Sequence, residues 1–182
     1  MRLLARKNTT APAGCDDLRA RASRQAADDI ALLQCTAGGD RTAFAQLCRR
    51  LQHPLFGYLM IVAGDRAAAE ELLGETWIEI WRQAARFDGR VAVNVWAFSL
   101  AQHRVIRRHS RAFGDPALPH MSPAATDAPA IQNAEHRAIL NLTYHQEFSV
   151  REIAEILGVS PPIVRVRMSQ ARQCIKTGAS PT

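Results

Sequence analysis

The chain has 182 residues, of which 47% are hydrophobic and 22% charged, and its formal net charge is +6. This composition is typical of one or two small globular domains and excludes a disordered or fibrous chain. The positive charge favours an anionic partner such as nucleic acid, although a charge of this size also occurs on proteins that it merely keeps soluble.

Several classes of protein are disfavoured by motifs that the sequence lacks. The four cysteines show no CxxC spacing and the six histidines no metal-ligand spacing, so we expect neither a disulfide framework nor a metal site. Hydrolase, P-loop and dinucleotide-binding signatures are absent, so we expect no catalytic residue, no cofactor and no enzyme. There is no run of 18 apolar residues and no secretory signal in MRLLARKNTT, which favours a cytoplasmic protein without membrane insertion.

The expected fold class is all-α, in two small helical domains joined by a Pro-rich linker. Val, Ile and aromatic residues nowhere alternate with polar residues, so no sheet is expected. Residues 1–26 carry Arg, Lys and Ala without a clear period and are expected to form a flexible basic extension. A helical domain follows over 27–112. The density of proline over 113–133 marks a linker, which leads to a second domain over 134–177 and a tail over 178–182.

The first domain is expected to consist of four helices. A short helix beginning near Asp28 ends at a glycine pair, and the next helix is bent or broken at Pro54. Asp65 can cap the third helix, and a fourth runs over about 94–109. In the third helix the apolar positions recur at i, i+4, i+7 and i+11, as Leu73, Trp77, Ile80 and Ala84.

The stretch SVREIAEILGVSPPIVRVRM contains two consecutive prolines between two short apolar-periodic segments. Ser149 and the glutamate three residues later fit a capping box that opens one helix, and Gly158 lies where that helix ends. Ser160 can cap a second helix whose first residues are Pro161 and Pro162. At these positions proline costs little, because the N–H groups have no partner within the helix. The prolines therefore begin a helix, and the pattern predicts a helix-turn-helix.

The second of these helices combines an apolar stripe with a basic surface. The stripe consists of Val164, Met168, Ala171 and Ile175. The opposite face presents Pro162, Val166, Ser169 and Gln173. All four acidic residues of the second domain precede the turn, and only basic charges follow it. Basic side chains along a helix that enters a major groove would neutralise phosphates, whereas the alternative is a solvated face on an ordinary bundle.

Two further clusters occupy the first domain. Its third helix carries four glutamates between apolar positions, together with Trp77 and Trp81, and could bind a partner protein. Residues 86–111 are rich in arginine and include Trp96 and Phe98. Arginines interleaved with aromatic residues suit contacts to phosphates and stacking on bases. In the alternative interpretation of both clusters, the aromatic residues belong to the core and the charges are merely solvated.

The sequence resembles bacterial RNA polymerase sigma factors of the extracytoplasmic-function type (group IV). The core-binding and promoter-melting segment of that family is similar to GDRAAAEELLGETWIEIWRQAARFDGRVAVNVWAFSLAQHRVIRR. The family's C-terminal helix-turn-helix is similar to AILNLTYHQEFSVREIAEILGVSPPIVRVRMSQAR. The two matches occur in the family's order and cover roughly residues 28–111 and 135–176. The resemblance implies a transcription initiation subunit that binds core RNA polymerase and promoter DNA and is held inactive by an anti-sigma factor.

The resemblance also implies roles for three sets of residues. Polymerase would be bound through Glu71, Leu72, Glu75, Trp77 and Trp81. The minus-ten promoter element would be melted through Arg90, Asn94, Trp96, Arg104, Arg107, Arg108 and Arg111. The minus-thirty-five element would be read through Ser160, Ile163, Arg165, Val166, Arg167, Ser169, Gln170 and Arg172. Among these, Val166 could contact a thymine methyl but cannot form a bidentate hydrogen bond.

The sequence departs from the family's pattern at several positions. Gly74 stands where the family commonly has Gln, and His103 and Arg107 stand where it has Asn and Asp. The Leu-Pro signature that opens the family's second domain is missing, so the first helix there is expected to be short or absent. Two alternatives therefore stay open. One is a helix-turn-helix regulator that does not join polymerase, and the other is a degenerate sigma-like protein that initiates poorly.

Overall fold

The computed structural model describes residues 13–113 and 136–176, with the side chains of residues 24–109 and 136–174. Every regular element in these ranges is helical, which confirms the all-α fold class. Three expected segments lie wholly or largely outside the described residues. They are residues 1–12 of the extension, 114–133 of the linker and the whole tail.

The described part of the first unit consists of four α-helices and one short turn of 3-10 helix. Their bounds are α1 Ala13–Ala37, α2 Arg41–Ala63, α3 Arg66–Gln83, η1 Ala84–Arg86 and α4 Val93–Phe113. Asp40 begins α2 by accepting hydrogen bonds from two backbone N–H groups, and Asp65 begins α3 by accepting one from Ala68 N at 2.8 Å. Between them Gly64 ends α2 in the left-handed region, with φ of 79°.

Two expectations about these helices need correction. Helix α1 begins at Ala13, so residues 13–26 are not a flexible extension. This stretch has no apolar period, but it is rich in Ala and Arg, and such residues extend a helix that is already anchored by packing. Of the expected bend or break at Pro54, the break is absent: α2 continues through Pro54 as one helix, and the buried Leu51 and Leu55 on either side pack in the core.

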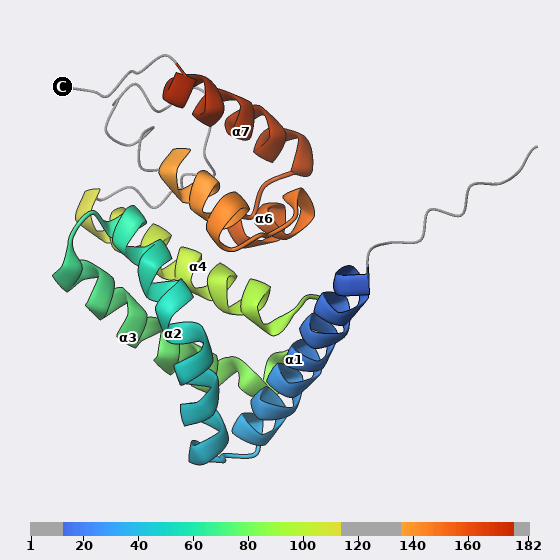
Figure 1. Ribbon diagram of the computed structural model, residues 1–182. Helices are drawn as coiled ribbons and strands as arrows, with labels where there is room; N and C mark the ends of the chain where they lie inside the picture. Colours follow the sequence, from blue (N-terminus) through green and yellow to red (C-terminus); the bar gives the residue numbers. More distant parts are fainter. Residues whose placement is uncertain (1–12, 114–135, 177–182) are drawn as a thin grey trace, which may run out of the picture.

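The second unit is a short helical segment followed by a helix pair. Residues 136–140 are helical and lead into a π-helical turn at Asn141–His145. Because the description begins at residue 136, the expectation that the first helix is short or absent stays a prediction. Helices α6 (Val150–Leu157) and α7 (Pro161–Lys176) follow. Figure 1 shows the helices stacked in layers, with α4 between α3 and α6, and α6 between α4 and α7.

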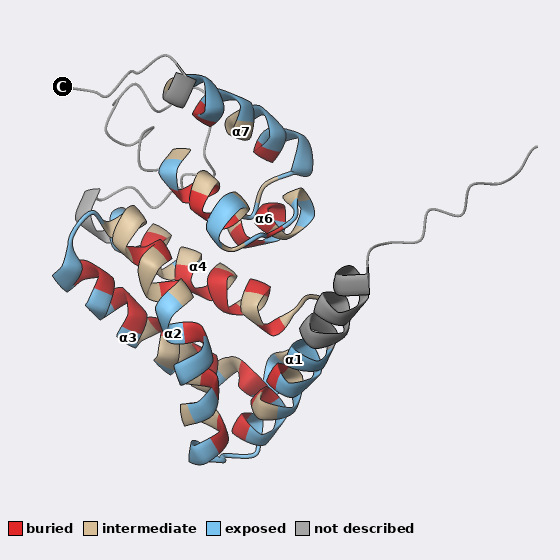
Figure 2. Ribbon diagram, in the orientation of Figure 1, coloured by how far each residue is buried: buried red, intermediate tan, exposed pale blue. Residues whose placement is uncertain are grey.

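One hydrophobic cluster runs through both units. The buried faces of the helices point toward one another across these layers (Figure 2). At the centre the ring of Phe98 in α4 lies 5.4 Å from that of Tyr58 in α2 and 5.1 Å from that of Phe148, which precedes α6. The Tyr58 hydroxyl donates a hydrogen bond to Gln102 Oε1 at 2.6 Å, and complete burial raises the pKa of Tyr58. The two helical units therefore share one core.

Candidate nucleic-acid interface

The turn between α6 and α7 has the geometry that the sequence predicts. Ser149 N donates to Glu152 Oε2 at 2.8 Å, and Glu152 N donates to Ser149 Oγ at 3.3 Å, which completes the capping box. Gly158 lies in the left-handed region with φ of 65°, and its N–H bonds back to the end of α6. Helix α7 then begins at Pro161, after the carbonyl of Ser160 has accepted its first hydrogen bonds. The prolines begin the helix rather than breaking it.

Helix α7 separates an inward stripe from an outward face, as predicted. Val164 and Ala171 are fully buried, whereas Val166 and Ile163 are among the few large apolar residues that the described side chains expose. The polar residues on the outward side are also exposed; they are Ser160, Arg165, Ser169, Gln170 and Arg172. The expected stripe residue Ile175 lies beyond the described side chains. The outward face is therefore accessible to a large partner.

The three arginines of α7 differ in their surroundings. Arg165 is exposed, whereas Arg167 is half-buried and its charge acts on His136. Burial, assisted by that charge, lowers the pKa of His136, which favours its neutral form. Arg172 is held by Tyr144, an exposed residue of the π-helical turn that the sequence reasoning did not single out. Only a contact between distant parts of the chain brings Tyr144 to this surface.

Ion pairs connect the acidic helix α3 to the basic helix α4. Arg104 pairs with Glu79 and, at 3.9 Å, with Glu75, and Arg108 pairs with Glu71. The expected partners were different ones: polymerase for Glu71 and Glu75, and promoter DNA for Arg104 and Arg108. In the structure much of their charge is neutralised within the domain. A hydrogen bond from Gln83 and the charge of Arg104 lower the pKa of Glu79 despite its partial burial.

The residues expected to bind polymerase divide between the interior and the surface of α3. Leu72 is only 1% exposed and packs in the core, so in this structure it is not available to a partner. Trp77 and Trp81 are half-buried and meet the Phe44 ring of α2 edge-on, with centroids at 6.5 and 5.1 Å. The outward face instead presents Ile78, which is 53% exposed and which the sequence reasoning missed. The sequence did hold a signal: Ile78 is one residue after Trp77, so a helix turns it away from the inward apolar stripe.

The loop before α4 is internally ordered. Arg90 Nε lies 3.0 Å from Asp88 Oδ2, and Gly89 between them adopts φ of 73°. Trp96 meets the Phe87 ring edge-on at 5.3 Å and is partly buried. At the start of α4, Asn94 accepts a hydrogen bond from Val95 N at 2.8 Å. The loop thus holds Arg90 highly exposed, with its charge beside Asp88.

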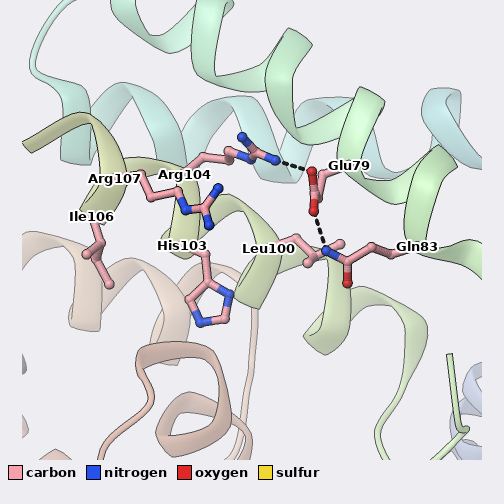
Figure 3. Close-up of a pocket in the computed structure, with 7 residues that line it drawn as sticks. All are labelled: Glu79, Gln83, Leu100, His103, Arg104, Ile106 and Arg107. Carbon is pink, nitrogen blue, oxygen red and sulfur yellow. Dashed lines mark hydrogen bonds and ion pairs between the residues drawn. The ribbon is translucent and has the colours of Figure 1, made fainter. Parts of the chain in front are cut away.

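A cleft of about 250 Å³ lies between the C-terminal part of α3 and α4. It is lined by Glu79, Gln83, Leu100, His103, Arg104, Ile106 and Arg107 (Figure 3). Burial and the nearby positive charge of Arg107 lower the pKa of His103, so the imidazole is favoured in its neutral form. Arg107 itself is exposed, unlike Arg104. Arg111 lies on α4 as well, but its side chain is beyond the described ones.

The described residues form neither of two other kinds of site. No group of three or more potential metal ligands occurs there, and no helix in the described ranges is long and apolar enough to cross a bilayer.

Two family models match the chain, and together they span more than half of it. Residues 47–112 match sigma-70 region 2, and residues 133–175 match sigma-70 region 4. The ECF RNA polymerase sigma factor SigK of Mycobacterium tuberculosis (strain H37Ra) is 33% identical over 86 residues, 47% of this chain and 46% of SigK. The chain therefore spans about half the length of this curated relative. SigL of Mycobacterium tuberculosis (strain CDC 1551) is 29% identical over 162 residues, 76% of this chain and 92% of SigL.

Solved structures share the fold. The structure of CnrH in complex with the cytosolic domain of CnrY matches with a TM-score of 0.62 and 21% identity, over 84% of this chain and 99% of that one. The sigma factor RpoE from Bartonella quintana, in complex with the anti-sigma factor NepR, matches with a TM-score of 0.56 and 18% identity, over 76% and 98%. On the two region models and the ECF relatives, the chain belongs to the sigma-70 family, in its extracytoplasmic-function group.

Proposed function

We propose that this protein binds core RNA polymerase and directs promoter-specific initiation of transcription. The first domain opens the minus-ten element, and the helix-turn-helix reads the minus-thirty-five element as duplex DNA. The observation that carries this proposal is the exposed outward face of α7, whose N-terminal turns present Ile163, Arg165 and Val166. In helix-turn-helix proteins these turns of the second helix enter the major groove.

The chemistry of this face suits a mixed mode of base recognition. Val166 is 57% exposed and fits against a thymine methyl group. Gln170, one helical turn further along, can form the bidentate hydrogen bonds that identify adenine. Arg165 lies on the flank, where it can neutralise a phosphate. Specificity would come from the first two side chains and affinity from the arginine.

For promoter melting the structure favours a smaller set of contacts than the resemblance implies. Arg90 and Arg107 are exposed, on the loop and on the rim of the cleft, and can reach phosphates. Arg104 is only 16% exposed and is paired with Glu79, so it is better suited to joining α4 to α3. The partly buried Trp96 can stack on a base only if it moves away from Phe87.

The polymerase-binding surface is the outward face of α3. It presents Glu71, Glu75 and the apolar Ile78, and Gly74 lies among them. A side-chain carbon at Gly74 would meet no atom within 4 Å, so packing within the protein does not require the glycine. An anti-sigma partner is also proposed, by analogy with RpoE, which was solved with the anti-sigma factor NepR.

The test is in vitro transcription with purified core polymerase and a pool of genomic promoter fragments. New promoter-specific transcripts are expected only when the protein is present. Glu75→Gln, which removes the charge of a partly exposed α3 side chain but places no positive charge beside Arg104, should fold normally and capture less polymerase; Arg49→Gln on the exposed side of α2 serves as the matched control. Polymerase binding without transcripts would contradict the melting role. Failure to bind polymerase would leave a helix-turn-helix regulator.

A further inference from the structure

An exposed tyrosine lies beside the DNA-reading helix without belonging to it. Tyr144, in the π-helical turn Asn141–His145, is 57% exposed. Its hydroxyl accepts a hydrogen bond of 3.0 Å from Arg172 Nε, and the Arg172 guanidinium lies 5.9 Å from the centre of its ring. The two residues are far apart in sequence and on different elements. The contact therefore fixes the direction of an arginine that would otherwise be a flexible surface side chain.

Most of the hydrogen-bonding capacity left over by this contact is that of donors. Arg172 uses Nε, and its two terminal nitrogens retain their four N–H groups. Because the Tyr144 oxygen accepts from Arg172, the hydroxyl proton is left to donate elsewhere. Among the described residues no carboxylate forms an ion pair with Arg172. Neighbouring donors with a positive charge and no acidic partner are suited to a phosphate oxygen.

The position of the pair along α7 agrees with this chemistry. Arg172 follows Arg165 by seven residues, which is two helical turns, so both arginines lie on the same flank of the helix. At a rise of about 1.5 Å per residue they are separated by roughly 10 Å along the axis. Such a spacing lets one arginine act beside the base-reading turns while the other reaches the sugar-phosphate backbone at the edge of the groove.

We propose that Tyr144 and Arg172 together form a phosphate-binding pair that anchors the second domain on the backbone of the upstream promoter element. Tyr144 is the positioning residue: it holds the guanidinium in place and adds one donor of its own. The pair contributes to affinity and fixes the position of the domain along the duplex, but it gives no preference for a base sequence. This inference rests on the proposed function, because it requires α7 to lie in the groove.

The experiment uses the full-length protein bound to core polymerase and a labelled promoter duplex identified by transcription. Dissociation constants are measured over a range of KCl concentrations for the wild type, Tyr144→Phe, Arg172→Gln and the double variant. Arg172→Gln should lower the magnitude of the salt slope by about 0.9, the value for one phosphate contact. Tyr144→Phe keeps the ring and removes the hydroxyl. It should weaken binding about threefold to tenfold with a nearly unchanged slope.

The double variant separates positioning from a merely structural role. If Tyr144 acts through Arg172, Tyr144→Phe should have much less effect in the Arg172→Gln background than in the wild type. Arg49→Gln, on the exposed side of α2, should change neither the promoter affinity nor its salt slope. Wild-type affinity of Tyr144→Phe at every salt concentration, or equal losses in both backgrounds, would overturn the inference. If the wild-type holoenzyme itself does not bind the promoter, the proposed function fails and this inference fails with it.

Discussion

Replacement of Arg104 by methionine tests whether this arginine holds two helices together or contacts DNA. Methionine preserves much of the volume of the side chain and removes its charge. The Arg104 side chain is 16% exposed and that of its partner Glu79 is 19% exposed, so the pair lies between surface and interior. Breaking a surface pair costs about 0–1 kcal/mol, and breaking a buried pair about 3–5 kcal/mol. We therefore expect the free energy of unfolding to fall by about 2 kcal/mol.

The assay is urea unfolding at pH 7, followed by tryptophan fluorescence and by circular dichroism. For a protein of this size the dependence on urea is about 2 kcal/mol per molar, so the midpoint should fall by roughly 1 M. Arg107→Met is the matched control, because Arg107 lies on the same helix but is exposed. Its midpoint should change by less than about 0.3 M, while promoter binding weakens and the salt slope declines by about 0.9. A normal midpoint for Arg104→Met, combined with weakened promoter binding, would refute the structural role.

Four other predictions concern local features. Glu147 has φ of 54°, so Glu147→Gly should raise the free energy of unfolding by about 0.5–1 kcal/mol in a urea titration. Ser149→Ala removes half of the capping box and should lower it by about 1 kcal/mol. Because the pKa of Glu79 is lowered by folding, its stabilising contribution is present above the unfolded value near 4.3 and disappears as the pH falls through the folded pKa. Unfolding midpoints between pH 6 and pH 3 should show that loss, and a smaller loss in Glu79→Gln would identify its source. Ile78→Ser should leave the unfolding midpoint unchanged and weaken capture of core polymerase in a pull-down.

The local features of the fold could be predicted from the sequence because short-range chemistry determines them. The capping box at Ser149, the left-handed Gly158 and the helix start at Pro161 each depend on residues within one or two turns. The inward stripe of α7 followed from the helical period, and Val164 is indeed fully buried.

The pairing of charges could not be predicted in the same way. Arg104 and Arg107 are three residues apart and look equivalent in the sequence, yet only Arg104 meets Glu79 across the helix interface. Which of them does so depends on the rotation of α4 against α3, and no local pattern encodes that rotation. The contact between Tyr144 and Arg172 escaped prediction for the same reason. The assignments of individual residues to polymerase and promoter remain predictions.

The shared core has a consequence for the thermodynamics of promoter binding. Since Phe98 packs against both Tyr58 and Phe148, we expect the isolated protein to unfold in a single cooperative transition, and two separate transitions would show that the units are independent. Any promoter complex that holds the two units apart must first break the contact between Phe98 and Phe148. The binding-competent form is then a minority population of the free protein. Every 1.4 kcal/mol by which the packed form is favoured lowers the apparent affinity for the promoter about tenfold.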